Sequence, residues 1–278
     1  MIYFKKYVLP PGSSAMCILT SVVRPLKTFG KGCICFFVKE KSKFMRNPFR
    51  TLNRFELTLW ISSLIVVTLS YLAAGNEGII SLIASLIGVT ALIFVAKGNV
   101  FGQILTIFFS ILYAVVSYRF RYYGEMITYV GMSLPAAAIA VYTWIKNLYS
   151  GDKSEVKTAK LGKVKMTLVI LLTAAVTWAF YYILGFLGTA NLFISTVSVA
   201  TSFSACTLLI LRSPLYAVAY AVNDVVLITM WTLASIEDIR YLPMIFCFCM
   251  FLFNDLYGFF NWRRMSRRQS AKAPNAAL

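Results

Sequence analysis

Two Asn-Asp pairs stand in strongly apolar segments of this sequence. Asn223 and Asp224 lie within YAVNDVVLITMW, and Asn254 and Asp255 lie within FNDLYGFFNW. Amide groups donate and accept hydrogen bonds, and a carboxyl group accepts them or balances a positive charge. A charged group among apolar residues is costly, so it normally faces a cavity or a partner. The two pairs therefore predict a polar cavity shared by two apolar segments.

Helical spacing adds further polar side chains to these pairs. Positions three or four apart share one face of a helix, so Tyr216 and Tyr220 fall on the same side as Asn223. Another segment carries a continuous polar stripe made of Asn99, Gln103, Thr106, Ser110, Tyr113 and Ser117. Any single serine in such a stripe is more often a packing residue than a ligand. The candidate binding residues are Gln103, Tyr113, Tyr216, Tyr220, Asn223, Asp224, Asn254, Asp255 and Tyr257.

Aromatic rings beside amides and carboxyl groups suit a flat, positively charged organic molecule. Tyr216 and Tyr220 would stack on its ring, and Asn223 with Gln103 would hydrogen-bond its edges. Asn254 and Asp255 would orient it or balance its charge. The carboxyl groups could instead be protonated or bonded to the Asn neighbours, since no Lys or Arg lies at their depth. The candidate gate residues lie at the expected outer mouth and are Tyr118, Tyr122, Tyr123 and Glu125. For any single Tyr at that depth, interfacial anchoring is the commoner role.

Composition identifies the class of protein. Hydrophobic residues make up 59% of the 278 residues and charged residues 13%, against about half and a quarter in soluble proteins. The net charge of +17 could suggest a nucleic-acid partner. The basic residues, however, concentrate at the N-terminus, at 146–166 and at the C-terminus, outside the apolar runs. Such blocks orient membrane proteins, so we expect a polytopic membrane protein in the lipid bilayer and no nucleic acid.

A bilayer-spanning helix needs about 20 apolar residues. The predicted spans are 57–74, 78–96, 100–118, 124–145, 166–187, 191–211, 214–234 and 241–261. The distribution of Lys and Arg places both termini in the cytoplasm. Residues 1–44 contain only short apolar patches and read as a disordered or mispredicted extension, and residues 45–278 read as one transmembrane domain.

Catalytic and metal chemistry is not indicated by the residue types present. The sequence contains no histidine, which excludes Ser-His triads, His proton relays and His-ligated metals. No nucleophile, base and orienting group come together along the chain. We therefore expect neither an enzyme nor a cofactor or metal site.

An internal repeat relates the two halves of the membrane domain. A shift of 118 residues aligns 90–146 with 208–264 without a gap and superposes Trp144 on Trp262 and Tyr123 on Tyr241. Each repeat contains four spans, and an even number returns the chain to the same side of the membrane. The repeats are therefore expected to be parallel, with the binding site near the midplane between them.

Three segments resemble the PnuC family of bacterial vitamin transporters. They are GNVFGQILTIFFSILYAVVSYRFRYYGEM at 98–126, TYVGMSLPAAAIAVYTWIKN at 128–147 and NDLYGFFNWRRM at 254–265. The resemblance implies a SWEET-like arrangement of two three-helix bundles, 78–145 and 191–262, joined by a linker helix at 166–187 and preceded by one additional helix. It also implies a bacterial cell-membrane homotrimer that takes up nicotinamide riboside by facilitated diffusion, with phosphorylation inside the cell trapping the product.

Two positions depart from the pattern of the nicotinamide riboside branch. That branch carries WxxWxxxN, whereas this sequence has Tyr216, Ala219 and Asn223 at the corresponding positions. Thiamine or riboflavin therefore remains an alternative substrate, as does a vitamin-binding membrane subunit that needs an energising partner. The expected mechanism is alternating access by rocking of the bundles, with Pro135 and Gly258 as flexible points. Proton coupling through Asp224 or Asp255 is a further hypothesis.

Overall fold

The computed structural model describes residues 48–74, 79–119, 122–189 and 191–271. The chain divides into two units, residues 1–50 and residues 51–278. Of the first unit, residues 48–50 are described, and they begin the short 3-10 helix η1 (Pro48–Thr51). The predicted extension, residues 1–44, lies outside the described residues. All the long helices belong to the second unit.

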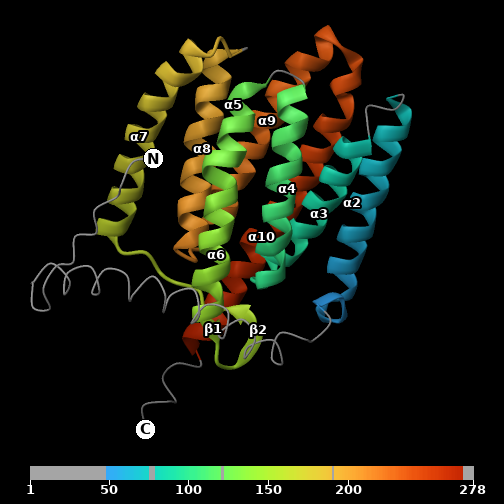
Figure 1. The fold of residues 1–278 in the computed structure, drawn as a ribbon. Coiled ribbons are helices and arrows are strands. Elements are labelled where there is room, and N and C mark those ends of the chain that lie inside the picture. The colour runs from blue at the N-terminus through green and yellow to red at the C-terminus, as the bar shows by residue number, and fades with distance from the viewer. Residues whose placement is uncertain (1–47, 75–78, 120–121, 190, 272–278) are drawn as a thin grey trace, which may run out of the picture. The chain divides into compact units, whose positions relative to one another are not determined.

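Within the described residues, eight helices are long and apolar enough to cross a membrane, which confirms the predicted all-α membrane fold (Figure 1). They are α2 (Arg54–Ala73), α3 (Ile79–Ala96), α4 (Val100–Arg119), the composite span of α5 (Tyr123–Thr128), η2 (Tyr129–Ser133) and α6 (Leu134–Lys146), α7 (Lys163–Phe186), α8 (Leu192–Ile210), α9 (Tyr216–Glu237), and η3 (Ile239–Tyr241) with α10 (Leu242–Ala271). Helix α10 continues past the predicted end at residue 261, because the charged residues after its apolar run still favour a helix.

Capping and turn residues set several helix ends. Asn53 accepts the N–H of Glu56 at 2.8 Å while the Glu56 carboxylate accepts the N–H of Asn53 at 2.6 Å, which forms a capping box at the start of α2. Gly98 turns the chain from α3 into α4 with a left-handed φ of 67°, a conformation that glycine adopts without steric cost. Arg212 makes the turn from α8 to α9 with a φ of 57°.

Two groups of three helices form the centre of the second unit. In the first bundle α4 packs against α3 and α6, and in the second bundle α9 packs against α8 and α10. The bundles meet along two contacts, α3 with α10 and α6 with α8. The first helix of each bundle therefore contacts the third helix of the other.

Helices α2 and α7 flank this centre at opposite edges of the drawing (Figure 1). Helix α2 packs against α3 and α10, whereas α7 packs against α8. Only Val169 and Leu184 of the 24 residues of α7 are buried. The rest of α7 presents apolar side chains outward, as expected for a helix that faces lipid or another subunit.

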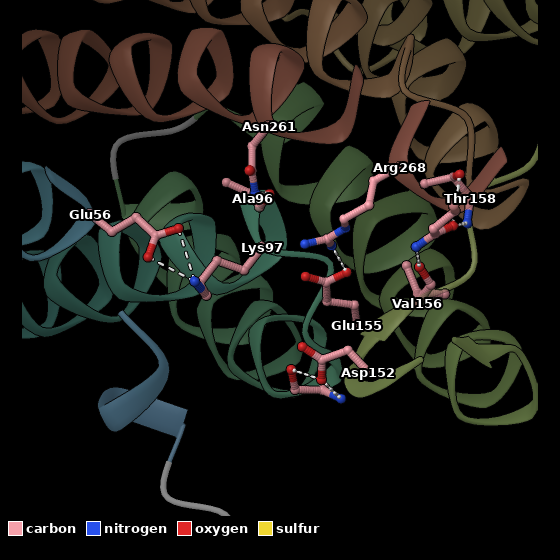
Figure 2. Close-up of polar contacts among 11 residues, drawn as sticks. Glu56, Ala96, Lys97, Asp152, Glu155, Val156, Thr158, Asn261 and Arg268 are labelled. Carbon is pink, nitrogen blue, oxygen red and sulfur yellow. Dashed lines mark hydrogen bonds and ion pairs between the residues drawn. The ribbon is translucent and has the colours of Figure 1, made fainter. Parts of the chain in front are cut away.

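The basic connection between α6 and α7 contains an antiparallel hairpin of β1 (Leu148–Tyr149) and β2 (Asp152–Val156). Val156 is fully buried, and its N–H donates to the carbonyl of Gly98 at 2.9 Å. Gln269 of α10 donates to the Val156 carbonyl at 3.1 Å and accepts from the N–H of Thr158 at 2.9 Å (Figure 2). The two strands pair with each other, and partners from a distant turn and a distant helix end hold the hairpin in place.

A buried ion pair fastens α2 to the same end of the molecule, which we call the hairpin end. The Lys97 ammonium contacts both carboxylate oxygens of Glu56, at 2.9 and 2.7 Å (Figure 2). The Tyr257 hydroxyl of α10 donates to the same carboxylate at 2.6 Å. Glu56 is 2% exposed, so its charge depends on these partners and on its own cap.

Candidate functional site

A cavity of about 60 Å³ lies between the two bundles. Both bundles contribute to its walls through α3, α4 and η2 on one side and α8, α9 and α10 on the other. Its lining residues are Gly88, Ala91, Leu92, Val95, Gln103, Thr106, Phe109, Ser110, Tyr129, Ser133, Ser202, Leu209, Tyr220, Asn223, Asp224, Phe251 and Asp255.

Several polar atoms at this cavity have no protein partner. Gln103 is 0% exposed, and neither its amide nitrogen nor its amide oxygen is hydrogen-bonded within the described part of the chain. The Ser110 hydroxyl and one carboxyl oxygen of Asp224 also have no hydrogen-bond partner within the described residues. Buried polar groups are nearly always hydrogen-bonded in folded proteins. These atoms are therefore available to a polar ligand.

Asn223 is held in one orientation by hydroxyl groups of α8. Its side-chain oxygen accepts from Thr201 Oγ1 at 2.8 Å and from Ser202 Oγ at 2.9 Å. Because the oxygen is engaged, the amide NH₂ remains as the donor that Asn223 offers to the cavity. Thr201 is not a lining residue, so its contribution is to position Asn223.

The two aspartates of the Asn-Asp pairs come together at the cavity. Asp224 of α9 and Asp255 of α10 are 2% and 3% exposed, and their carboxyl groups lie within hydrogen-bonding distance of each other. Ionised carboxylates only accept hydrogen bonds, so a bond between two carboxyl groups requires at least one proton. With a single shared proton the pair carries one negative charge, which would balance one positive charge on a ligand.

Aromatic side chains form the rest of the wall, and sequence reasoning missed most of them. Phe109, Tyr129 and Phe251 all line the cavity beside Tyr220. The Phe109 ring meets those of Tyr129 and Phe251 edge to face, at centroid distances of 5.7 and 5.5 Å. The sequence indicated these residues only through its general abundance of aromatic side chains. The position of one isolated aromatic residue does not reveal whether its face of the helix points inward.

The π-helix η2 brings Tyr129 and Ser133 to the cavity. Pro135 follows directly in the first turn of α6 and has no backbone N–H, so the regular helical bond to the residue four positions earlier cannot form there. Local widening of this kind is frequent at functional sites. Pro135, expected as a flexible point, was the one sequence signal near this irregularity.

Five of the nine predicted binding residues line the cavity, and four do not. The lining residues are Gln103, Tyr220, Asn223, Asp224 and Asp255. The structure does not bring the other four into the cavity wall, because other elements cover the helix faces that carry them. They are Tyr113, Tyr216, Asn254 and Tyr257.

Asn254 and Tyr257 face α2 instead. Asn254 donates to Ser63 of α2 at 3.2 Å, and Tyr257 donates to Glu56 at the start of α2. The two residues share one face of α10, so the same helix covers both. Their interactions attach α2 to α10, the third helix of the second bundle.

Tyr113 and Tyr216 are packed in two cores on either side of the cavity. Tyr113 accepts a hydrogen bond from Trp231 Nε1 at 3.1 Å, and its ring lies 4.3 Å from that of Tyr129. Tyr216 packs edge to face on Trp262 at 4.7 Å. Tyr113 therefore supports the wall residue Tyr129, and Tyr216 belongs to the core toward the hairpin end.

The four predicted gate residues lie at the end opposite the hairpin, in different environments. Tyr118 is 60% exposed, and its ring lies 6.0 Å from that of Tyr123. Tyr122 is buried against Trp231 at 4.9 Å, and burial raises the pKa of its hydroxyl to about 12.

Glu125 joins the two bundles at this end. It is 2% exposed and accepts a hydrogen bond from Ser198 of α8 at 2.9 Å. Its second carboxylate oxygen has no partner within the described residues. A contact of this kind must break if the bundles separate here.

A metal centre is not visible among the described residues, where no three His, Cys, Asp or Glu side chains gather in one place. The residues that line the cavity can supply hydrogen bonding, ring stacking and charge balance. These interactions suit the binding of a small molecule.

Residues 78–264 match the profile of a family described as Nicotinamide mononucleotide transporter. A nicotinamide riboside transporter PnuC of Neisseria mucosa is 26% identical over 247 residues, which are 85% of this chain and 94% of that protein. A protein of the same name from Haemophilus influenzae is 24% identical over 76% of this chain and 90% of its own. The crystal structure of the vitamin B3 transporter PnuC superposes with a TM-score of 0.71 and 26% identity, and covers 78% of this chain and 94% of that one.

Proposed function

This chain belongs to the nicotinamide mononucleotide transporter family, and we propose that it takes up nicotinamide riboside across a bacterial cell membrane. It is a multi-pass membrane transporter and not an enzyme. The observation that carries the proposal for the substrate is the cavity between the bundles. There the Asp224–Asp255 carboxyl pair, the Gln103 amide, which has no partner among the described residues, and aromatic rings meet.

The chemistry of nicotinamide riboside matches these groups. Its pyridinium ring is flat and positively charged, so it can stack on Tyr220 and Phe109 while the Asp224–Asp255 pair balances its charge. Its carboxamide and ribose offer donors and acceptors to Gln103 and to the amide of Asn223. Sites for small molecules commonly combine such apolar walls with a few placed polar groups.

Transport requires the bundles to move relative to each other. The cavity of about 60 Å³ is far below the roughly 300–1,000 Å³ of small-molecule sites. The contacts of α3 with α10 and of α6 with α8 support a parallel repeat, in which 78–145 and 191–262 rock about the cavity and 166–187 links them. The Glu125–Ser198 bond is a contact that opening at that end would break.

Orientation, energetics and assembly are further parts of the proposal. Lys97, Arg212 and the basic end of α10 share the hairpin end, which supports cytoplasmic termini. We propose facilitated diffusion, with phosphorylation in the cell trapping the vitamin. A homotrimer is expected from the resemblance, and the exposed apolar face of α7 offers surface for its contacts.

Thiamine is the alternative that a specific observation favours. It is also an organic cation, with its charge on a flat thiazolium ring, so the carboxyl pair suits it, whereas riboflavin is uncharged and gains nothing from that pair. Tyr216 and Ala219 stand where the nicotinamide riboside branch carries tryptophans. Binding measurements with both cations therefore decide between them.

Calorimetry with the purified protein in detergent tests the proposal. We expect nicotinamide riboside to bind and riboflavin not to bind. The Asn223→Ala variant should weaken binding about 2- to 13-fold, because it removes the amide donor that Asn223 offers to the cavity, a hydrogen bond worth about 0.5–1.5 kcal/mol. Asn261→Ala is the matched control, because Asn261 donates to the Ala96 carbonyl at 2.9 Å away from the cavity (Figure 2).

Three results would count against parts of the proposal. Binding of thiamine alone would retain the site and change the substrate. Binding without uptake in reconstituted vesicles would support a subunit that needs an energising partner. Equal losses in the Asn223 and Asn261 variants would reject the cavity as the binding site.

A further inference from the structure

A second hollow, of about 410 Å³, opens at the hairpin end, away from the central cavity. It lies between the segment that leads into α7, the turn from α8 to α9, and the last turns of α10. Its cationic lining residues are Lys160, Arg263 and Arg267. Its apolar lining includes Met166, Leu215 and Phe259. We call it the basic groove.

The basic residues of this groove have no acidic partner among the residues that the structure describes. Arg268, one position further along α10, forms an ion pair with Glu155 (Figure 2). Within the described part of the chain, Lys160, Arg263 and Arg267 form no ion pair, and no Asp or Glu lines the groove. Among the described residues, three positive charges therefore surround one hollow without a counter-charge.

The groove combines these charges with an apolar floor. The Arg263 guanidinium lies 5.3 Å from the centre of the Phe259 ring, one helical turn earlier, which holds the charge at the edge of the apolar part. Arg263 and Arg267 are four residues apart and share one face of α10. The apolar part is continuous with the membrane-spanning ends of α7 and α9. Met166 belongs to α7, and Leu215 directly precedes α9.

This arrangement matches the two parts of an anionic phospholipid. A phosphodiester is a strong acceptor for guanidinium groups, and acyl chains pack against apolar side chains where a helix leaves the membrane. Basic pockets between helices at one face of a membrane protein are a known form of anionic-lipid recognition. We propose that the basic groove binds an anionic phospholipid, with its phosphate between Lys160, Arg263 and Arg267 and its acyl chain against Phe259 and Leu215.

The proposal is independent of the transported vitamin, because none of the groove residues lines the central cavity. A lipid here would contact both the start of the linker helix α7 and the second bundle. Its expected effect is therefore to hold these two elements together at the membrane surface.

Native mass spectrometry of the full-length protein in detergent can count bound lipids. The probes are phosphatidylglycerol, phosphatidylcholine with the same acyl chains, and inorganic phosphate. Wild type should retain phosphatidylglycerol in preference to phosphatidylcholine. The Arg263→Gln/Arg267→Gln variant should bind phosphatidylglycerol roughly tenfold more weakly or worse, and Arg267→Gln alone should show a smaller loss.

Arg264→Gln is the matched control, because Arg264 neighbours Arg263 on α10 and does not line the groove. It should bind phosphatidylglycerol as wild type does. Equal weakening in this control would overturn the proposal in favour of a diffuse surface charge. Displacement of the lipid by millimolar inorganic phosphate, or equal retention of phosphatidylcholine, would also overturn it. Loss of self-association in the double variant, with lipid binding unchanged, would identify the groove as a subunit contact.

Discussion

Replacing Gln103 with methionine should stabilise the protein while weakening its binding of the vitamin. Gln103 is 0% exposed and its side-chain amide has no hydrogen-bond partner within the described residues. A buried polar group left unpaired costs about 1–3 kcal/mol. Methionine has similar length, is unbranched and carries no strongly polar atom. The Gln103→Met variant should therefore gain about 1–3 kcal/mol in free energy of unfolding.

The same substitution removes a donor and an acceptor from the cavity. Each hydrogen bond to a ligand contributes about 0.5–1.5 kcal/mol net, so the loss of two should weaken binding by about 5- to 150-fold. Stability and affinity are expected to change in opposite directions. An ordinary packing residue would not behave in this way, because its loss lowers stability.

Gln269 offers a matched control in the same chain. It is 8% exposed, and its amide donates to Val156 and accepts from the backbone N–H and the hydroxyl of Thr158 (Figure 2). The Gln269→Met variant leaves those partners unpaired and should lose about 1–3 kcal/mol. It should not alter the affinity of the cavity, because Gln269 does not line it.

Thermal unfolding in detergent and calorimetry with nicotinamide riboside measure the two quantities on each variant. Wild type, Gln103→Met and Gln269→Met should rank differently in the two assays. If Gln103→Met is destabilised as much as Gln269→Met and binds the vitamin as wild type does, the amide of Gln103 serves the fold and the reasoning about the cavity is refuted.

Two further substitutions test charge and shape at the cavity. The Asp224→Asn/Asp255→Asn double variant removes the negative charge of the pair and should weaken binding of the cationic vitamin tenfold or more. Asp255→Asn alone keeps one ionisable carboxyl group, so its affinity should stay within a few fold of wild type. Equal losses of affinity in the two variants, measured by calorimetry, would contradict charge balance. In Gly88→Ala the new methyl group would lie 2.5 Å from Phe251 Cζ, so the ring must shift and the affinity for the vitamin should fall. In the control Gly131→Ala no atom lies within 4 Å of the new methyl group, so this variant should bind the vitamin as wild type does.

The class of fold follows from local properties of the sequence. A span is recognised from a run of apolar residues long enough to cross a bilayer, and each of the eight runs satisfies this by itself. The hairpin at 148–156 was not predicted. Its two short strands pair with each other, and its place in the fold depends on bonds from Val156 to Gly98 and Gln269, which are distant in the sequence. The reading of residues 1–44 stays a prediction.

Asn254 and Asp255 show what only the tertiary structure decided. The sequence alone indicated that polar groups at membrane depth need a cavity or a partner, because that cost depends on residue type and depth. Adjacent residues of a helix point about 100° apart, and the neighbouring helices determine what each one meets. Asn254 meets Ser63 of α2, while Asp255 meets Asp224 at the cavity. Residue type thus fixes the need for a polar partner, and the packing of distant helices selects it.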